Sequence, residues 1–530
     1  MSDAARPAAG LPVTAGLPVA AGLPVAAGAV VLRVATLDAD LAQSLAALRA
    51  DVGTDRCRVA RSRRTVEAAL ADGRAHYGVN TGFGSLKSVR VDAADLVALQ
   101  ENLVRSHAVG VGPPVPEAAS RRMLALKVHA LGLGFSGVSV AVFERLLAMA
   151  ERGVTPVVPS QGSLGASGDL APLAHLALPL LGEGELWHDG APAPAAEVLA
   201  AHGLAPVALS AKDGLALING TQFMAALGSE MLARALRLAE TADVVAAMTL
   251  EAVRGSAAPF DARVHAVRPH AGAILVAERV RALLAGSEIG PSHAGCDRVQ
   301  DPYSVRCVPQ VHGASRDALA YAAQQVETEL NSVTDNPLVF SGADGAPDLI
   351  SAGNFHGQPL ALAFDVAAIA VAELASVSER RTYLLLDGPD RLPPYLMAET
   401  GVRSGFMMVQ YTAAALVSEN KTLCHPASVD SIPSSRGQED HVSMGAWGAR
   451  KALAVVENAE RVLAAEALCA AQALDFRRPL RAGAGVEAAW RAVRARVAFR
   501  TEDAAFAPDL AACTALVASG EIAAAGLAAP

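Results

Sequence analysis

Residues 358–386 read QPLALAFDVAAIAVAELASVSERRTYLLL, an apolar run far longer than the helix of about 11–12 residues that is common in globular proteins. Single carboxylates interrupt the run at Asp365, Glu373 and Glu379. Four further stretches share this length and pattern, at roughly 214–253, 313–332, 404–424 and 440–473. Because each long helix must bury an apolar face, the sequence predicts a mainly α fold, a bundle of long helices with a loop-rich N-terminal region.

The composition agrees with closely packed helices and excludes several classes of function. Hydrophobic residues make up 52% of the chain and aromatic residues only 4%, so the apolar content is mostly Ala, Leu and Val. A net charge of −9 gives no support for nucleic-acid binding. The 13 histidines include no H-x-x-x-H or H-E-x-x-H pair, and we expect no metal site. The six cysteines show no C-x-x-C spacing, and no apolar run of about twenty residues lacks a charge, so we expect reduced thiols and a soluble, cytoplasmic protein.

Three regions follow from the pattern along the chain. Residues 1–28 carry Gly-Leu-Pro-Val three times, from positions 10, 16 and 22, and we expect a low-complexity, disordered tail. Residues 29–212 begin with a possible strand at 29–37 and continue as helices that alternate with Gly- and Pro-rich loops. Residues 213–530 hold the long helices, which a loop with three prolines interrupts between Asp387 and Arg403.

A triplet of unusual chemical potential lies in the second region. Residues 162–170 read GSLGASGDL, with Ala166, Ser167 and Gly168 at the centre. If the amide nitrogen of Gly168 bonds to the carbonyl carbon of Ala166 and two waters leave, a 4-methylidene-imidazol-5-one ring forms. Its exocyclic methylene, derived from Ser167, is an electrophile, a kind of group for which most enzymes need a cofactor. A plain glycine-rich turn is the structural alternative.

The setting of the triplet favours the electrophile. Gly162 and Gly165 leave the backbone free to compress. The apolar run after Asp169 predicts a helix that Pro179 ends, so the triplet would lie beside a helix N-terminus, whose dipole favours negative charge.

Residues 162–174, GSLGASGDLAPLA, resemble the signature of the aromatic amino acid ammonia-lyases. That family includes the histidine, phenylalanine and tyrosine lyases and the related 2,3-aminomutases. The resemblance extends over roughly residues 30–515 through several motifs in the same order. It implies the fumarase/aspartase-like helical fold and a homotetramer whose active sites are shared between subunits. It also implies that Ala166, Ser167 and Gly168 form the ring autocatalytically, with no external cofactor.

The octapeptide YGVNTGFG at 77–84 places a tyrosine among three glycines. A tyrosine that closes a turn is the structural alternative, but the segment resembles the family loop that carries a catalytic tyrosine. The resemblance implies that Tyr77 removes the β-proton of the substrate. Because a phenol has a pKa near 10, this role requires neighbouring dipoles or charges to lower it.

Carboxylate recognition points to the segment QDPYSVR at 300–306, because the guanidinium of Arg306 can pair with a carboxylate through two hydrogen bonds. Gln300, Tyr303 and Arg306 are spaced by three and would share one face of a helix. The resemblance implies that Arg306 binds the substrate carboxylate, with Gln300 and the catalytic Tyr303 lining the pocket. In LINGTQ at 217–222, Asn219 can cap a helix. The resemblance implies instead that Asn219 binds near the substrate carboxylate and supports the electrophile. Phe355, in GNFHG, resembles the family's aromatic residue that shields the electrophile.

Three positions bear on the choice of substrate: His107, Met407 and Glu439. Each matches the side-chain pocket of the histidine lyases, and the phenylalanine and tyrosine lyases typically have Asn-Gln-Asp where this chain has Gln438-Glu439-Asp440. A buried carboxylate can form a charge-assisted hydrogen bond with an imidazole, but a phenyl ring would leave it unpaired, at a cost of about several kcal/mol. The resemblance therefore implies conversion of L-histidine to trans-urocanate and ammonia, the first step of histidine degradation.

Two alternatives stay open at the level of sequence. A phenylalanine or tyrosine lyase or an aminomutase would share the electrophile and differ at Glu439. A helical homo-oligomer without activity would need neither the triplet nor Tyr77 and Arg306. Whether the electrophile takes up the amine or the aromatic ring of the substrate also stays open, and the amine is favoured because it is the leaving group.

Overall fold

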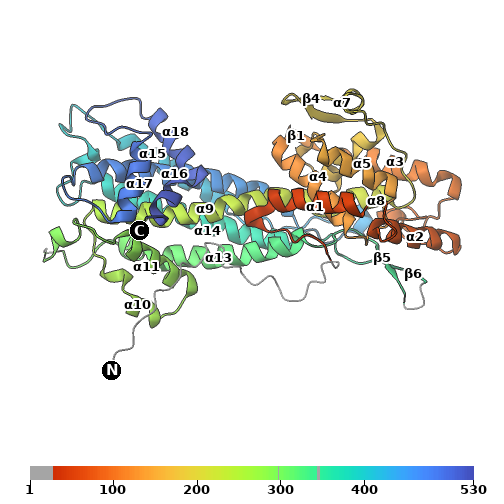
Figure 1. The fold of residues 1–530 in the computed structure, drawn as a ribbon, viewed down its shortest axis with the longest axis horizontal. Coiled ribbons are helices and arrows are strands. Elements are labelled where there is room, and N and C mark those ends of the chain that lie inside the picture. Colours follow the sequence, from red (N-terminus) through yellow and green to blue (C-terminus); the bar gives the residue numbers. More distant parts are fainter. Residues whose placement is uncertain (1–27, 296–297, 343–345, 530) are drawn as a thin grey trace. The chain divides into compact units, whose positions relative to one another are not determined.

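The computed structural model describes residues 28–295, 298–342 and 346–529. Helices dominate this part of the chain, and its strands form three separate two-stranded antiparallel sheets (Figure 1). The predicted mainly α fold is therefore confirmed. The repeats of the predicted N-terminal tail lie within residues 1–27, outside the described residues.

Two compact units make up the fold, and neither is one continuous segment. The first combines the chain up to Glu230 with Ala323–Ala363 and Ala427–Ala449. The second combines Met231–Ala322, Phe364–Pro426 and the chain from Arg450 onward.

Short helices and all three sheets lie in the first unit. Its sheets pair β1 (Val111–Pro114) with β2 (Pro159–Gln161), β3 (Glu185–His188) with β4 (Ala191–Pro194), and β5 (Leu338–Ser341) with β6 (Pro347–Ile350). Its helices are α1 (Leu37–Asp51), α2 (Arg58–Ala71), α3 (Leu96–His107), α4 (Glu117–Gly132), α5 (Val140–Glu151), α6 (Leu170–Ala177), α7 (Ala195–Ala201) and α8 (Asp213–Ile218). The C-terminal half of α4, from Met123 on, is buried throughout, and α1 and α5 pack against this helix.

The five long helices that the sequence predicts are present. They are α9 (Gln222–Ala252), α13 (Val308–Leu330), α14 (Gln358–Leu386), α15 (Met407–Leu423) and α16 (Gly445–Asp475). One predicted helix, at 214–253, is in fact two, because the chain breaks at residues 219–221 between α8 and α9. Shorter helices complete the second unit: α10 (Ala262–Ala266), α11 (Ala271–Leu283), α12 (Tyr303–Arg306), α17 (Ala484–Arg494), α18 (Ala507–Ser519) and α19 (Glu521–Leu527).

Charged side chains inside the second unit are paired. Arg381 and Glu466 are fully buried and joined by two hydrogen bonds, of 2.5 and 2.9 Å. A further guanidinium nitrogen of Arg381 lies 3.2 Å from Nε2 of His312, whose Nδ1 lies 2.9 Å from the carboxylate of Asp243. Because unpaired buried charges are costly, this chain of contacts fixes α9, α13, α14 and α16 in one register.

Among the described residues, α14 alone is a single helix long and apolar enough to cross a membrane. However, 67% of its apolar window is buried inside the protein, as in a core helix.

Two local predictions near the N-terminal region had different outcomes. The strand predicted at 29–37 is wrong: residues Val34–Thr36 form a 3₁₀ turn that leads into α1. The amide and carbonyl of Leu32 bond to the side chain of Asn331, each at 2.8 Å, so this backbone needs no neighbouring strand. The predicted end of the helix after the triplet is confirmed, because α6 stops at Ala177 and Pro179 lies in a 3₁₀ turn.

Candidate active site

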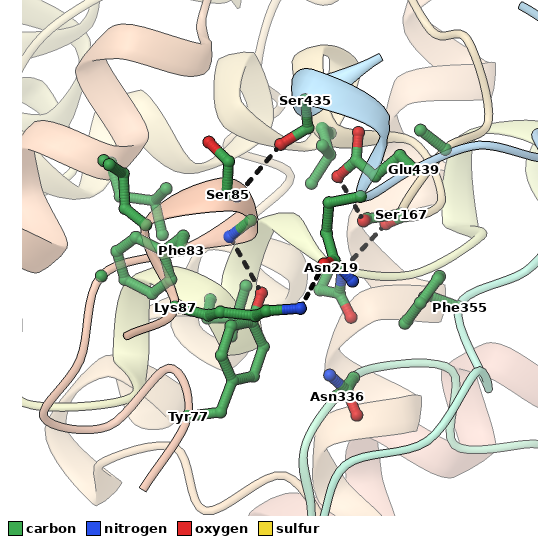
Figure 2. Close-up of a pocket in the computed structure, with 18 of the residues that line it drawn as sticks. Tyr77, Phe83, Ser85, Lys87, Ser167, Asn219, Asn336, Phe355, Ser435 and Glu439 are labelled. Carbon is green, nitrogen blue, oxygen red and sulfur yellow. Dashed lines mark hydrogen bonds between the residues drawn. The ribbon is translucent and has the colours of Figure 1, made fainter. Parts of the chain in front are cut away.

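A cavity of about 1240 Å³ opens in the first unit, beside the Ala-Ser-Gly triplet (Figure 2). Side chains from seven separate segments line it, so it forms only when the chain folds. Of the residues predicted from sequence, the following line it: Tyr77, His107, Ala166, Ser167, Asn219, Phe355 and Glu439.

The backbone of the triplet is pressed against a second glycine-containing turn. Gly168 has a φ of +75°, and a Cβ built there would lie 2.1 Å from the carbonyl oxygen of Gly220. The amide of Asp169 donates to that same oxygen at 2.7 Å. Only glycine can occupy position 168 at this approach, which explains the residue type.

Asp169 fixes the triplet from its C-terminal side. This fully buried carboxylate accepts hydrogen bonds from the hydroxyl of Ser163 at 2.9 Å and from the amide of Met224 at 3.0 Å. Burial raises the pKa of Asp169 to about 7. Helix α6 begins at the next residue, so the triplet lies beside a helix N-terminus, as the sequence predicts.

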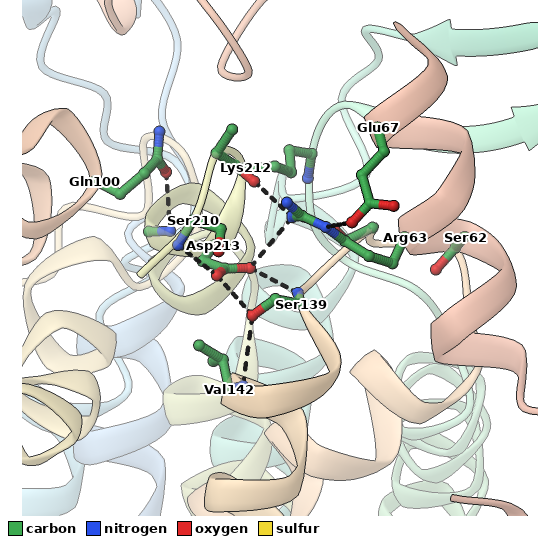
Figure 3. A network of polar contacts seen from close by, with 12 residues as sticks. Ser62, Arg63, Glu67, Gln100, Ser139, Val142, Ser210, Lys212 and Asp213 are labelled. Atoms are coloured by element: carbon green, nitrogen blue, oxygen red, sulfur yellow. Dashed lines mark hydrogen bonds and ion pairs between the residues drawn. The ribbon is translucent and has the colours of Figure 1, made fainter. Parts of the chain in front are cut away.

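Asn219 connects the triplet to the break between α8 and α9. Its Nδ2 donates to the carbonyl oxygen of Ser167 at 2.9 Å, while its Oδ1 is buried and has no hydrogen-bond partner among the described residues. Helix α8 is held at its first residue, Asp213, which accepts from Ser139 N, Ser139 Oγ and Ser210 N, each at 2.7 Å (Figure 3). The guanidinium of Arg63 lies 3.8 Å from the same carboxylate. Asn219 therefore extends from a rigid support.

Glu439 faces the triplet across the cavity. Its Oε1 accepts a hydrogen bond from the hydroxyl of Ser167 at 3.1 Å, and its Oε2 accepts one from the hydroxyl of Ser434 at 2.8 Å (Figure 2). Ser434 thus fixes the orientation of the carboxylate, and the other oxygen is directed to Ser167.

Tyr77 presents its hydroxyl to the same cavity. The amide of Gly84 donates to this oxygen at 3.2 Å, which favours the ionised phenol. Burial nevertheless raises the pKa of Tyr77, and the negative charge of Glu439 adds to this effect. The lowered pKa that the predicted role of a base requires is therefore not found in this chain within the described residues.

His107 ends α3 with its ring in a defined tautomer. Its Nδ1 lies 2.8 Å from the carbonyl oxygen of Leu103, which can only accept, so Nδ1 carries the proton. Burial lowers the pKa of His107, so the ring is neutral near pH 7 and its Nε2 is a hydrogen-bond acceptor.

Four predicted residues lie in the second unit and do not line this cavity: Gln300, Tyr303, Arg306 and Met407. Gln300 precedes the four-residue helix α12, so the predicted single helical face holds only for Tyr303 and Arg306. The guanidinium carbon of Arg306 lies 4.8 Å from the ring centroid of Tyr303, whose side chain is 71% exposed. No arginine is among the described residues that line the cavity.

Sequence reasoning missed several residues of the site, notably Lys87, Ser434, His356 and His441. Two 3₁₀ turns, Gly84–Leu86 and Ser435–Gly437, meet where the amide of Ser85 donates to the hydroxyl of Ser435 at 3.2 Å. Nearby, the ammonium of Lys87 donates to the side-chain carbonyl of Gln438 (Figure 2). These contacts join the loop of Tyr77 to the loop of Glu439, segments about 350 residues apart that no local pattern could connect.

The surroundings of the triplet fit the self-formed electrophile. The Ser167 carbonyl oxygen, which would become the ring carbonyl, accepts from Asn219. Gly168 and Gly220 leave no space for side chains, and Asn219 Oδ1 is a buried acceptor for which the described part of the chain supplies no partner.

Comparisons with known proteins agree with this chemistry. The sequence profile described as aromatic amino acid lyase matches residues 39–495. A histidine ammonia-lyase of Sorangium cellulosum is 56% identical over 475 residues, which cover 88% of this chain and 92% of the relative. One from Deinococcus radiodurans is 54% identical and covers 88% of each chain.

Solved structures show the same likeness. A histidine ammonia-lyase from Trypanosoma cruzi matches with a TM-score of 0.82 and 44% identity, covering 89% of each chain. A tyrosine aminomutase from Streptomyces globisporus matches with a TM-score of 0.84 and 39% identity, covering 93% of this chain and 97% of the other. The chain belongs to the aromatic amino acid lyase family.

Proposed function

We propose that this protein is a histidine ammonia-lyase that eliminates ammonia from L-histidine to give trans-urocanate. The observation that carries the proposal is the carboxylate of Glu439, directed at Ser167 inside the cavity that His107 also lines. The overall fold does not separate a lyase from an aminomutase, because both kinds of solved structure match equally well. The side chains that line the cavity therefore have to distinguish between these two activities.

Glu439 and His107 suit an imidazole better than a phenyl ring. The carboxylate of Glu439 can accept from an imidazole N–H, and Nε2 of neutral His107 is a second acceptor. A phenyl ring has no polar hydrogen to give to either group, and the carboxylate would be desolvated without compensation. Two acceptors in one cavity therefore favour a substrate ring that carries a polar hydrogen, as an imidazole does.

The reactive group is the 4-methylidene-imidazol-5-one derived from Ala166, Ser167 and Gly168. When formed, it supplies an electrophile that activates the amino group of the substrate as a leaving group. Asn219 would hold its carbonyl oxygen through Nδ2, as it holds the Ser167 carbonyl. The ring of Phe355, which lines the cavity, would exclude stray nucleophiles.

Tyr77 would remove the β-proton of the substrate at its phenolate oxygen, where the Gly84 amide already donates. Because burial raises the pKa of Tyr77 in the single chain, the positive charges that lower it must arrive with other groups. The substrate ammonium and the guanidinium of Arg306 are two such charges.

Arg306 would reach the substrate carboxylate from another copy of the chain. The cavity has no arginine of its own among the described residues, whereas Tyr303 and Arg306 are on a surface segment with Tyr303 largely exposed. Exposed apolar side chains on α14 and α15, such as Ile369, Tyr383 and Tyr411, suit burial against other copies. We therefore infer that Gln300, Tyr303, Arg306 and Met407 complete the active site of a neighbouring subunit; the number of subunits, a homotetramer, is what the family resemblance implies.

The experiment that tests the function follows ultraviolet absorbance with L-histidine, L-tyrosine and L-phenylalanine in parallel. Each expected product is a conjugated acid with its own spectrum. Urocanate from histidine alone supports the proposal. Cinnamate or coumarate would keep the electrophile and refute the assignment of Glu439 and His107, which would favour a phenylalanine or tyrosine lyase. No product with any substrate would favour an inactive scaffold.

A further inference from the structure

Lys127 is a buried lysine with an unusual environment. It lies on α4 with 1% of its surface exposed, and its Nζ donates to the backbone carbonyl of Asn219 at 2.7 Å. Among the described residues, no carboxylate oxygen lies close enough to this nitrogen, within 4.0 Å, to form an ion pair. The neighbouring buried Lys212, in contrast, pairs with Asp335 at 3.1 Å. A buried cation without an ion-pair partner is costly, so its single hydrogen bond requires an explanation.

The carbonyl that Lys127 contacts belongs to the turn that holds the triplet. The side chain of Asn219 donates to the Ser167 carbonyl at 2.9 Å, and the next residue, Gly220, accepts from the Asp169 amide at 2.7 Å. This turn therefore holds the chain on both sides of Gly168. The position of these contacts depends on how firmly the backbone of Asn219 is fixed.

Lys127 is the group that completes this fixation. The amide of Asn219 bonds to the carbonyl of Leu215 within α8, at 3.0 Å, and its carbonyl bonds to Lys127. The side-chain Oδ1 has no partner among the described residues, so it does not orient the amide group. Without Lys127, the buried carbonyl of Asn219 would also be left without its hydrogen-bond donor, which destabilises the turn.

We propose that Lys127 is a positioning residue for cyclisation of the triplet, acting through Asn219. In this step the nitrogen of Gly168 bonds to the carbonyl carbon of Ala166, and its proton moves to the carbonyl oxygen. That hydroxyl leaves as water with the proton of the Ser167 amide, which creates a C=N bond. The hydroxyl of Ser167 then leaves as a second water with the Cα proton, which creates the methylene, so the step needs no oxidant.

Within this step, Lys127 keeps the Asn219 side chain on the Ser167 carbonyl while the flanking peptide rotates toward Ala166. The proposal rests on the proposed function, since it requires that the triplet cyclises. Burial lowers the pKa of Lys127 to about 7, while the charges of Asp335 and Asp169 act in the opposite direction, so the nitrogen can donate in either protonation state.

The test measures cyclisation by intact mass, because the mature chain lacks two waters. Protein is synthesised in a cell-free system, and the fraction with the mass deficit is followed with time for the wild type, K127M and K127R. We expect the half-time of cyclisation to lengthen at least about tenfold in K127M, as suits loss of one charge-assisted hydrogen bond. K127R keeps a cationic donor and should cyclise much faster than K127M.

Lys451 provides a matched control in the second unit. It is also 1% exposed and also donates to a backbone carbonyl, that of His425, at 2.7 Å, and it differs from Lys127 in forming an ion pair with Asp365. K451M should lower thermal stability at least as much, because it also removes the ion-pair partner of Asp365, and should leave cyclisation at the wild-type rate. Cyclisation of folded K127M at that rate, or an equal delay in K451M, would overturn the proposal. If K127M gives no folded protein, K127Q is judged by the same two criteria.

A double-variant experiment tests the route through Asn219. If Lys127 acts by placing that side chain, K127M should add no further delay in an N219A background, and an additive delay would refute this route. Failure of the proposed function looks different from failure here. A wild-type chain that never loses two waters refutes the electrophile itself, whereas normal cyclisation in K127M refutes only the role of Lys127.

Discussion

Replacement of Glu439 by glutamine isolates the feature that assigns the substrate. Ser434 holds one carboxylate oxygen at 2.8 Å, so the amide oxygen of glutamine can keep that bond and an NH₂ group then faces the cavity. An imidazole N–H loses a charged acceptor, which we expect to cost about 1.5–3 kcal/mol of transition-state stabilisation, or roughly a 10- to 150-fold decrease in kcat/KM for histidine.

Initial rates of urocanate formation measure this decrease, and intact mass must show that E439Q still loses two waters. Turnover of phenylalanine should rise, because the variant no longer buries an unpaired carboxylate against a phenyl ring. S434A is the matched control: it releases the carboxylate without removing it and should cost only about 0.5–1.5 kcal/mol. A kcat/KM within about threefold of wild type in E439Q would refute the assignment of Glu439 to the imidazole.

Three further predictions follow from the structure. Y77F and R306A should each lose nearly all turnover, and mixing the two after dissociation should restore part of it if Arg306 serves a neighbouring subunit; a mixture as inactive as its components would argue against shared sites. G168A should retain both waters in its mass and melt at a lower temperature, because Cβ would meet Gly220 O at 2.1 Å at a strained φ of +75°; a cyclised G168A would show that this approach is not limiting. His129 is buried with its pKa lowered from 6.5 to about 4, so its contribution to stability is complete above pH 6.5 and falls by about 3 kcal/mol as the pH drops through 4; thermal melts of H129L should depend less on pH over this range, and an unchanged profile would exclude His129 as the source.

The long helices could be predicted because the residues that each one buries form a continuous apolar pattern within its own segment of the sequence. The strand at 29–37 could not be excluded in this way, since its backbone partner is the Asn331 side chain, almost 300 positions later. The same limit applies to the break at 219–221, where Asn219 bonds to Ser167 and Lys127.

The site residues could be predicted where the signal is local and could not be predicted where it depends on a distant partner. Those set in a distinctive local motif, such as Tyr77, Ser167 and Glu439, were predicted and line one cavity. Residues whose role depends on a distant partner, such as Ser434 and Lys87, had no local signal. Lys127 had one, because it is a lone charge in the apolar run from Met123 to Leu131, but the run does not tell which carbonyl it contacts.

The hydrogen bond between Ser167 and Glu439 has a consequence for the maturation of the proposed active site. In a chain that has not yet cyclised, the hydroxyl of Ser167 donates to the Glu439 oxygen that a substrate N–H would need as its acceptor. If the triplet cyclises as proposed, loss of that hydroxyl as water would free the Glu439 oxygen at the same moment as the electrophile is completed. The same loss of water would then make the site able both to bind histidine and to react with it. In a preparation that is only partly cyclised, the fraction of chains that bind histidine should therefore equal the fraction that are active.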